Sequence, residues 1–173
     1  VNKDGVYNDA DQGIIGCGQP TFNWGWNNTF NYKNFDFSFF VVGFHGFDIY
    51  NATHQMGYNL IKSQQMAGVT PMRELLNRWT PTNTNTDIPG FVKGGTENKD
   101  FFSTRFVENG SFIKMKSITL GYTLPEATCR SLGINNLRVY ASVQNPFHIT
   151  KYSGLDPEAT MGSPLVQGVD WGA

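Results

Sequence analysis

The stretch from residue 21 to residue 44 constrains the fold most, because its apolar residues recur at every second position. Aromatic side chains occupy one parity of the run TFNWGWNNTFNY (21–32), and small or amide side chains occupy the other. The first set is Phe22, Trp24, Trp26, Phe30 and Tyr32, and the second is Asn23, Gly25, Asn27, Thr29 and Asn31. A period of two is typical of a β-strand with one apolar face. The alternation resumes in FDFSFFVVGF (35–44) after a very short connection, so the two runs predict a tight antiparallel hairpin.

Two further strands are expected, near 111–125 and 136–147. The first has the sequence SFIKMKSITLGYTLP and places Ile118, Leu120, Tyr122 and Leu124 on one side. The second begins NLRVYASVQ and alternates Leu137, Val139, Ala141 and Val143 with Arg138, Tyr140, Ser142 and Gln144. Strands of about ten to twelve residues match the length that a tilted strand needs to cross a membrane.

The connections between these strands are very unequal in length. The first two strands are joined by a tight turn, and the last two by EATCRSLGIN, which predicts a short helical turn. A long segment, 45–110, separates the second strand from the third and contains MRELLNRW, which predicts a helix over 72–79. Short turns on one side and long loops on the other are typical of a transmembrane β-barrel. A soluble β-sandwich could use the same apolar parity as its core, so the pattern alone leaves both folds open.

Composition excludes several classes of protein. Thirteen basic and fourteen acidic residues give a net charge of −1, which provides no electrostatic footprint for nucleic acid. Aromatic residues make up 14% of the chain and charged residues 16%, a balance that favours β proteins, outer-membrane barrels among them. The best apolar run, FSFFVVGF, is far shorter than the roughly 18 residues of a membrane helix. Residues 1–12 are polar and acidic and do not resemble a signal peptide.

Several blocks of sequence are specific enough to indicate a family. They are NTNTDIP, ENGSFIKMKSITLGYTLP and NLRVYASVQNPF, which follow DGVYNDADQGIIG and the aromatic hairpin in this order. In that order they resemble the C-terminal segments of the SusC/RagA family of TonB-dependent outer-membrane transporters. The resemblance implies an all-β fold, a plugged, twenty-two-stranded antiparallel barrel with long extracellular loops. Residues 1–173 would supply C-terminal strands of that barrel, without its plug domain or its last strand, so we expect an internal piece of a larger transporter.

The same resemblance implies a function. The whole protein would sit in the outer membrane of a bacterial cell and import an oligosaccharide or peptide with energy from TonB. A SusD-like surface lipoprotein would be its partner, outer-membrane lipid would surround it, and no enzymatic activity, required cofactor or nucleic acid would be involved. Two rival functions stay open: a soluble carbohydrate-binding β-sandwich module, and a TonB-dependent receptor for an iron chelate or cofactor. If both short connections are periplasmic, the segments 1–20, 45–110 and 148–173 lie outside the cell.

The first twelve residues, VNKDGVYNDADQ, have the spacing of an oxygen-ligand loop. With Gly5 at the sharp turn, the ligands to calcium would be Asn2, Asp4, the Val6 carbonyl, Asn8 and Asp11. The first ligand position would fall before Val1, and Asp11 stands where glutamate is usual. The alternative is an Asn/Asp/Gly turn held by side-chain-to-backbone hydrogen bonds.

Other candidate residues lie in the expected loops. Six loop aromatics could either contact substrate or pack within the loops: Trp79, Phe91, Phe101, Phe102, Tyr152 and Trp171. The histidines His45, His54 and His148 show no metal-ligand spacing and are expected to be single polar side chains. In the expected orientation Cys17 and Cys129 lie at opposite ends of a strand, about 35 Å apart, which predicts two free thiols.

Overall fold

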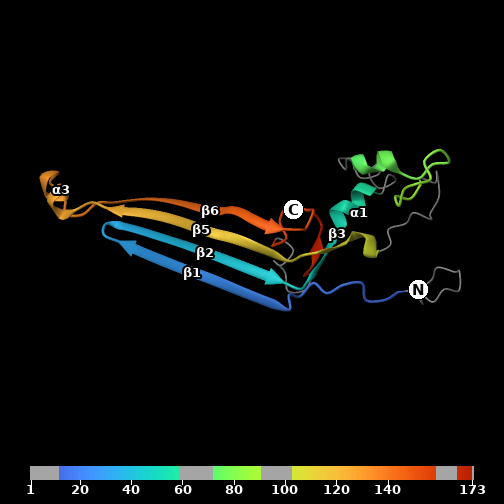
Figure 1. Cartoon of the computed structure of the whole chain (residues 1–173), viewed down its shortest axis with the longest axis horizontal. Coiled ribbons are helices and arrows are strands. Elements are labelled where there is room, and N and C mark those ends of the chain that lie inside the picture. Colours follow the sequence, from blue (N-terminus) through green and yellow to red (C-terminus); the bar gives the residue numbers. More distant parts are fainter. Residues whose placement is uncertain (1–11, 59–71, 91–102, 159–166, 173) are drawn as a thin grey trace. The chain divides into compact units, whose positions relative to one another are not determined.

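The computed structural model describes residues 12–58, 72–90, 103–158 and 167–172, which form two compact units (Figure 1). The sheet unit comprises residues 20–47 and 110–151. The loop unit comprises the described residues of 12–19, 48–109 and 152–172. The segments of the loop unit precede the first strand of the sheet unit, connect its second strand to its third and follow its fourth, so each unit is assembled from parts that are distant in the sequence.

The sheet unit is a single antiparallel sheet in the order β1-β2-β5-β6. Its elements are β1 (Phe22–Tyr32), β2 (Phe35–His45), β5 (Phe112–Thr123), α3 (Glu126–Ser131) and β6 (Arg138–Thr150). These strands correspond to the ranges expected near 21–32, 35–44, 111–125 and 136–147. The β1–β2 hairpin turns at Lys33 and Asn34, and Lys33 adopts a left-handed φ of 52°. The short helix α3 joins β5 to β6 at the same end of the sheet (Figure 1).

The pairing register places the alternating apolar side chains of all four strands on the same face of the sheet. Residues directly opposite one another project from the same face, and Trp26, Val41, Met115 and Phe147 form one such row across the sheet. The apolar face consists of Phe22, Trp24, Trp26, Phe30 and Tyr32 (β1), Phe35, Phe37, Phe39 and Val41 (β2), Ile113, Met115, Ile118, Leu120 and Tyr122 (β5), and Val139, Ala141, Val143, Phe147 and Ile149 (β6). Aromatic rings interlock along it, as in the edge-on contact of Trp26 and Phe39, whose centroids are 5.1 Å apart.

This apolar face is open rather than packed into a core. Trp26 is 55% exposed, Val143 54% and Ile149 65%. A soluble β-sandwich would bury these side chains against a second sheet, and no second sheet faces them among the described residues of the sheet unit. An apolar face of this extent suits a hydrocarbon environment.

The opposite face of the sheet is largely polar. It carries asparagine and threonine from β1, the hydrogen-bonded pair Thr119 and Ser142 (2.9 Å), and an ion pair between Asp36 and Arg138. Apolar side chains of β2 also reach this face, Phe40 in the middle of the strand and Val42 and Phe44 beyond it, and the rings of Phe44 and Phe112 stack with centroids 5.1 Å apart. The two faces therefore differ in polarity along most of the strands, as they do in a wall between lipid and water.

The register shifts once in the middle of the sheet. Phe40 pairs with Ser117 and Val41 with Met115, which leaves Lys116 as an extra residue on β5. The shift widens on β6, where Asn145 and Pro146 lie between the paired Gln144 and Phe147, and Asn145 has a φ of 48°. The extra residue changes which positions of β5 point to each side, so that Met115 and Ile118 lie on the same face, and such bulges bend and twist a sheet locally.

The loop unit contains short elements around a small mixed sheet. They are β3 (Asp48–Asn51), α1 (Ala52–Tyr58), η2 (Arg73–Asn77), η3 (Thr104–Phe106), β4 (Val107–Asn109) and β7 (Val169–Asp170). The sheet order is β4-β3-β7, with β3 antiparallel to β4 and parallel to β7. Its core is formed by Tyr50, Ala52 and Phe106, with Met56, Tyr58, Val107 and Val169 packed against them.

The long connection is thus more structured than its sequence indicated. The helix expected over 72–79 is wrong in type and extent, because the chain forms only a 3₁₀ helix over Arg73–Asn77. Leu75 is the buried residue of that helix, so one apolar side chain, rather than an apolar stripe, anchors it. Among the described residues, no helix combines the length and apolar content that a transmembrane helix requires.

Candidate functional site

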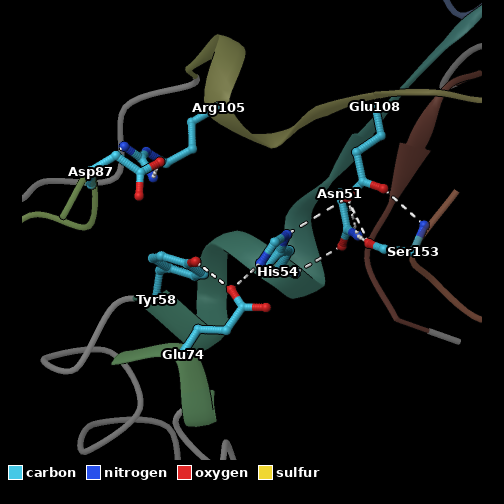
Figure 2. A network of polar contacts seen from close by, with 8 residues as sticks. All are labelled: Asn51, His54, Tyr58, Glu74, Asp87, Arg105, Glu108 and Ser153. Atoms are coloured by element: carbon cyan, nitrogen blue, oxygen red, sulfur yellow. Dashed lines mark hydrogen bonds and ion pairs between the residues drawn. The ribbon is translucent and has the colours of Figure 1, made fainter. Parts of the chain in front are cut away.

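A network of polar side chains connects α1, η2, β4 and the segment after β6 (Figure 2). It begins at Asn51, the last residue of β3, which is 3% exposed. The Asn51 Oδ1 accepts a hydrogen bond from the backbone N–H of His54 (2.8 Å) and so caps the first turn of α1. The Asn51 Nδ2 donates to Glu108 Oε1 (3.0 Å) and to Ser153 Oγ (3.2 Å).

Glu108 is the centre of this network. Its carboxylate accepts hydrogen bonds from the Ser153 backbone N–H (2.8 Å) and the Ser153 hydroxyl (2.8 Å) as well as from Asn51. Burial raises the pKa of Glu108, but these hydrogen bonds and the nearby His54 outweigh it and leave the pKa below its ordinary value. The charged form of Glu108 therefore holds three chain segments together.

His54 lies between two carboxylates. Its Nδ1 is 3.6 Å from Glu108 Oε1, and its Nε2 is 3.6 Å from Glu74 Oε2 on η2. The Tyr58 hydroxyl donates to Glu74 at 2.5 Å, a contact that lowers the pKa of Glu74. Burial, with the same contact, raises the pKa of Tyr58 to about 12. The rings of His54, Tyr58 and Phe106 pack edge to face, with centroids 4.9–6.0 Å apart.

A second set of contacts shapes the loop 78–90. Asn83 Nδ2 donates to the carbonyl oxygens of Asn77 (3.2 Å) and Arg78 (3.2 Å), and the Trp79 N–H donates to the Ile88 carbonyl oxygen (2.8 Å). Arg105 closes the loop from η3 by donating to the Asp87 backbone carbonyl oxygen. These bonds fix the backbone of the loop around Trp79, and 47% of that residue is exposed.

The polar network has no arrangement for nucleophilic catalysis. A serine nucleophile needs a basic nitrogen as its hydrogen-bond partner, and the Ser153 hydroxyl instead donates to the Glu108 carboxylate. Both ring nitrogens of His54 face carboxylates. Among the described residues, no group of three histidine, cysteine, aspartate or glutamate side chains is placed to hold a metal ion. The geometry fits a structural junction.

The site residues expected from sequence are distributed unevenly. The calcium ligands Asn2, Asp4, Val6, Asn8 and Asp11 and the aromatics Phe91, Phe101 and Phe102 lie outside the described residues. Trp171 is 57% exposed and Trp79 47% exposed, so burial excludes neither of the two alternatives for these residues. Tyr152 is 5% exposed and its hydroxyl donates to Asp170, which favours the packing alternative for this residue. These residues do not converge on one described pocket.

The sequence interpretation did not find the Glu108 network. It treated His54 as a single loop histidine, whereas its side chain is only 22% exposed and faces two carboxylates. One signal was present, because asparagine directly before a short helix is a favoured N-cap. Both cysteines are free thiols, Cys17 exposed and Cys129 buried.

Comparison with known proteins gives a consistent set of relatives, although no family model matches the chain. The chain is 35% identical to TonB-dependent receptor P3 of Formosa agariphila over 179 aligned residues, covering 100% of the chain and 17% of that protein. It is 32% identical to TonB-dependent receptor SusC of Bacteroides thetaiotaomicron, covering 93% of the chain and 15% of that receptor. The chain therefore spans about one sixth of the length of these relatives.

Solved structures agree with the sequence relatives. The RagAB peptide importer in its "closed-closed" state matches with a TM-score of 0.72 and 26% identity, covering 91% of this chain and 16% of the solved chain. The same importer in its "open-open" state matches with a TM-score of 0.69 and 26% identity, covering 88% of this chain and 15% of the solved chain.

Proposed function

Because this chain belongs to the SusC/RagA family of TonB-dependent receptors, as its sequence motifs predicted, we propose that it forms part of the wall and outer loops of a nutrient importer. The importer lies in the bacterial outer membrane and draws energy from TonB. This segment contributes no bond chemistry, and its role is to build the passage and its entrance.

The observation that carries the proposal is the difference between the two faces of the four-stranded sheet. Nineteen apolar side chains share one open face, with aromatic residues towards both ends of β1. The other face carries hydroxyl and amide groups and a paired charge. A membrane barrel requires this division, because one face meets hydrocarbon and the other meets water or a plug. In the complete protein, β1 and β6 pair with neighbouring strands of a twenty-two-stranded barrel.

The orientation follows from the lengths of the connections. The β1–β2 turn and α3 are short and belong on the periplasmic side, whereas the loop unit belongs outside the cell. Trp79 and Trp171 are the described aromatics exposed enough to touch a substrate there. We assign an oligosaccharide or a peptide as the substrate class and a SusD-like lipoprotein as the partner that caps the entrance.

The test is the growth and uptake of a strain that lacks the whole transporter gene. Loss of growth on one glycan or peptide, restored by the wild-type gene only when TonB is active, is the expected result. Unchanged growth and uptake on every nutrient tested would overturn the importer. Loss of iron-chelate uptake alone would indicate the alternative receptor, and a segment that is soluble and monomeric without detergent would indicate the sandwich module.

The calcium loop stays a prediction, and it would stiffen the outer rim just before β1. Calcium would be titrated into the intact transporter while the exchange of backbone amides in residues 1–12 is followed. Slower exchange with calcium, abolished by Asp4→Asn with Asp11→Asn, is expected. Unchanged exchange and melting would leave only an Asn/Asp/Gly turn.

A further inference from the structure

The loop unit joins three chain segments that lie in different connections of the sheet. The first precedes β1, the second runs from β2 to β5, and the third follows β6. Their meeting place is the short strand β3. On one side the Asp48 N–H donates to the Cys17 carbonyl oxygen (2.8 Å), and the Cys17 N–H donates to Asp48 Oδ2 (3.2 Å). The segment before β1 is thereby attached to β3.

The segment after β6 is attached to β3 by backbone pairing. Tyr50 pairs with Val169 and Asn51 with Asp170 in a parallel ladder, and the Tyr50 N–H donates to the Gly168 carbonyl oxygen at 2.7 Å. Gly168 has a φ of 79°, and a Cβ there would lie 2.8 Å from the Asp48 carbonyl oxygen. The close approach of the two segments therefore depends on glycine at this position.

Side chains attach the same two segments a second time. Ser153, at the start of the third segment, bonds to Glu108 of β4 through both its N–H and its hydroxyl. Asn51 donates to both partners from the end of β3. Charge-assisted hydrogen bonds that are partly shielded from water are among the stronger polar contacts in proteins.

The third segment is also closed on itself. The buried Tyr152 donates to Asp170, and Asp170 in turn accepts from the Gly172 N–H at 2.8 Å. Gly154 leaves room for the Tyr152 ring, because a Cβ at this position would lie 2.5 Å from Tyr152 Cζ. Both ends of the described third segment are thus fixed to each other and to β3.

We propose that the described residues of these three segments, held together by the contacts above, remain one rigid body throughout the transport cycle. This inference rests on the proposed function for its setting. The loop unit is then a fixed part of the rim, and substrate enters without separating Asn51 from Ser153.

A disulfide across the junction tests the proposal directly. In the full-length transporter, Asn51→Cys and Ser153→Cys are combined in a Cys17→Ser background, because the two native side chains are in contact, with Asn51 Nδ2 3.2 Å from Ser153 Oγ. The probe is the labelled nutrient on which the deletion strain fails to grow. Uptake is expected to be equal in the reduced and oxidised forms, with bond formation followed by mass spectrometry. Loss of uptake on oxidation and recovery on reduction would overturn the rigid body.

Two comparisons keep the result unambiguous. Each single cysteine variant, oxidised in the same way, controls for damage unrelated to the cross-link. If the double variant does not fold, hydrogen exchange in the unaltered full-length transporter decides instead. The Tyr50 amide is expected to be protected as strongly as amides of β2 and β5, and fast exchange at Tyr50 would overturn the proposal. If the wild-type transporter imports nothing, the proposed function fails while the exchange result still tests the rigid body.

Discussion

Arg138 of β6 holds Asp36 of β2 across the intervening strand β5, and the ion pair passes over Gly121. The contact is bidentate, with Arg138 Nε 3.0 Å from Asp36 Oδ1 and Nη2 2.5 Å from Oδ2. A Cβ at Gly121 would lie 2.5 Å from Asp36 Oδ2 and 2.6 Å from Arg138 Nη2. The ion pair therefore links β2 to β6 across β5 on the polar face, and it can do so because Gly121 of β5 has no side chain.

Gly121→Val is expected to disrupt this connection. The added side chain must displace the ion pair or bend β5, and overpacking of this kind costs about 1–3 kcal/mol. The measurement is the urea midpoint of the full-length transporter in lipid, followed as the heat-modifiable folded band on a gel. Arg138→Ala supplies the matched comparison, because removing the arginine also removes part of the collision. The double variant should lose less than the sum of the two single losses, and strict additivity would show that the collision is not the cause.

Glu108→Gln is expected to loosen the loop unit. The substitution keeps the size of the side chain but removes the charge that accepts hydrogen bonds from Ser153 and Asn51, and a hydrogen bond to a charged group contributes about 1.5–3 kcal/mol. Amides of β3 and β7 should then exchange faster in the intact transporter, while those of β5 and β6 keep their rates. Glu126→Gln on α3 is the control, since Glu126 pairs with Arg130 one turn away and its side chain is 84% exposed. Equal exchange in wild type and Glu108→Gln would contradict the role given to Glu108.

The loop unit should also respond to pH at both extremes. Glu74 and Glu108 have pKa values below the ordinary value of about 4.3, so their stabilisation is complete above that pH and is lost as the pH falls through the lower folded-state values. Tyr58 has a pKa raised to about 12. The contribution of Tyr58 to the stability of the loop unit is complete below about pH 10 and is lost between about pH 10 and about pH 12.

Limited proteolysis of the loop unit across a pH series measures this response. Cleavage should be slow and constant from about pH 5 to about pH 9 and should accelerate outside that range. Tyr58→Phe should make the alkaline change smaller and leave the acid change in place, and the remaining alkaline change is expected from Tyr152, whose pKa is also raised by burial and by its hydrogen bond to Asp170. An alkaline change of the same size in Tyr58→Phe would assign it to another group.

The four long strands could be predicted from sequence, and the short ones could not. Alternation over ten or more residues, as in Phe22–Tyr32, specifies both a strand and its faces. The strands β4 and β7 contain three and two residues, too few for a period to be visible. Their partners are also remote, as in the pairing of Tyr50 with Val169, and local pattern carries no information about that register.

The candidate site shows the same limit. Glu108 and Ser153 are 45 residues apart, and although Glu108 begins the block ENGSFIKMKSITLGYTLP, that block does not indicate which distant residue its carboxylate contacts. For Tyr152 the sequence left substrate contact and loop packing open, and its burial and bond to Asp170 favour packing. The capping asparagine was the one element of the network with a local signature, because it acts on the turn that directly follows it.

The two thiols should differ sharply in reactivity. Cys17 is exposed, whereas Cys129 is fully buried on α3 with its Sγ 3.8 Å from the Leu124 carbonyl oxygen. Maleimide should therefore label Cys17 within minutes in the folded transporter and Cys129 only after denaturation. Mass spectrometry of peptides containing the two residues reads both sites in one sample. Rapid labelling of Cys129 in the folded protein would mean that α3 opens readily.

A pair of neighbouring residues on β6 tests which face of the sheet meets lipid. Val143 lies on the apolar face and Gln144 on the polar face, at nearly the same height along the strand. Val143→Arg should destabilise the full-length transporter in lipid by about 2–4 kcal/mol, the cost of arginine near the middle of a bilayer. Gln144→Arg introduces the same side chain at an adjacent position and should cost much less, because its guanidinium reaches the aqueous interior. The stability of both variants is measured as the urea midpoint of the heat-modifiable folded form.

Equal losses of stability in the two variants would mean that both faces are buried alike, as in a sandwich. A larger loss for Gln144→Arg would reverse the assignment of lipid and water to the two faces.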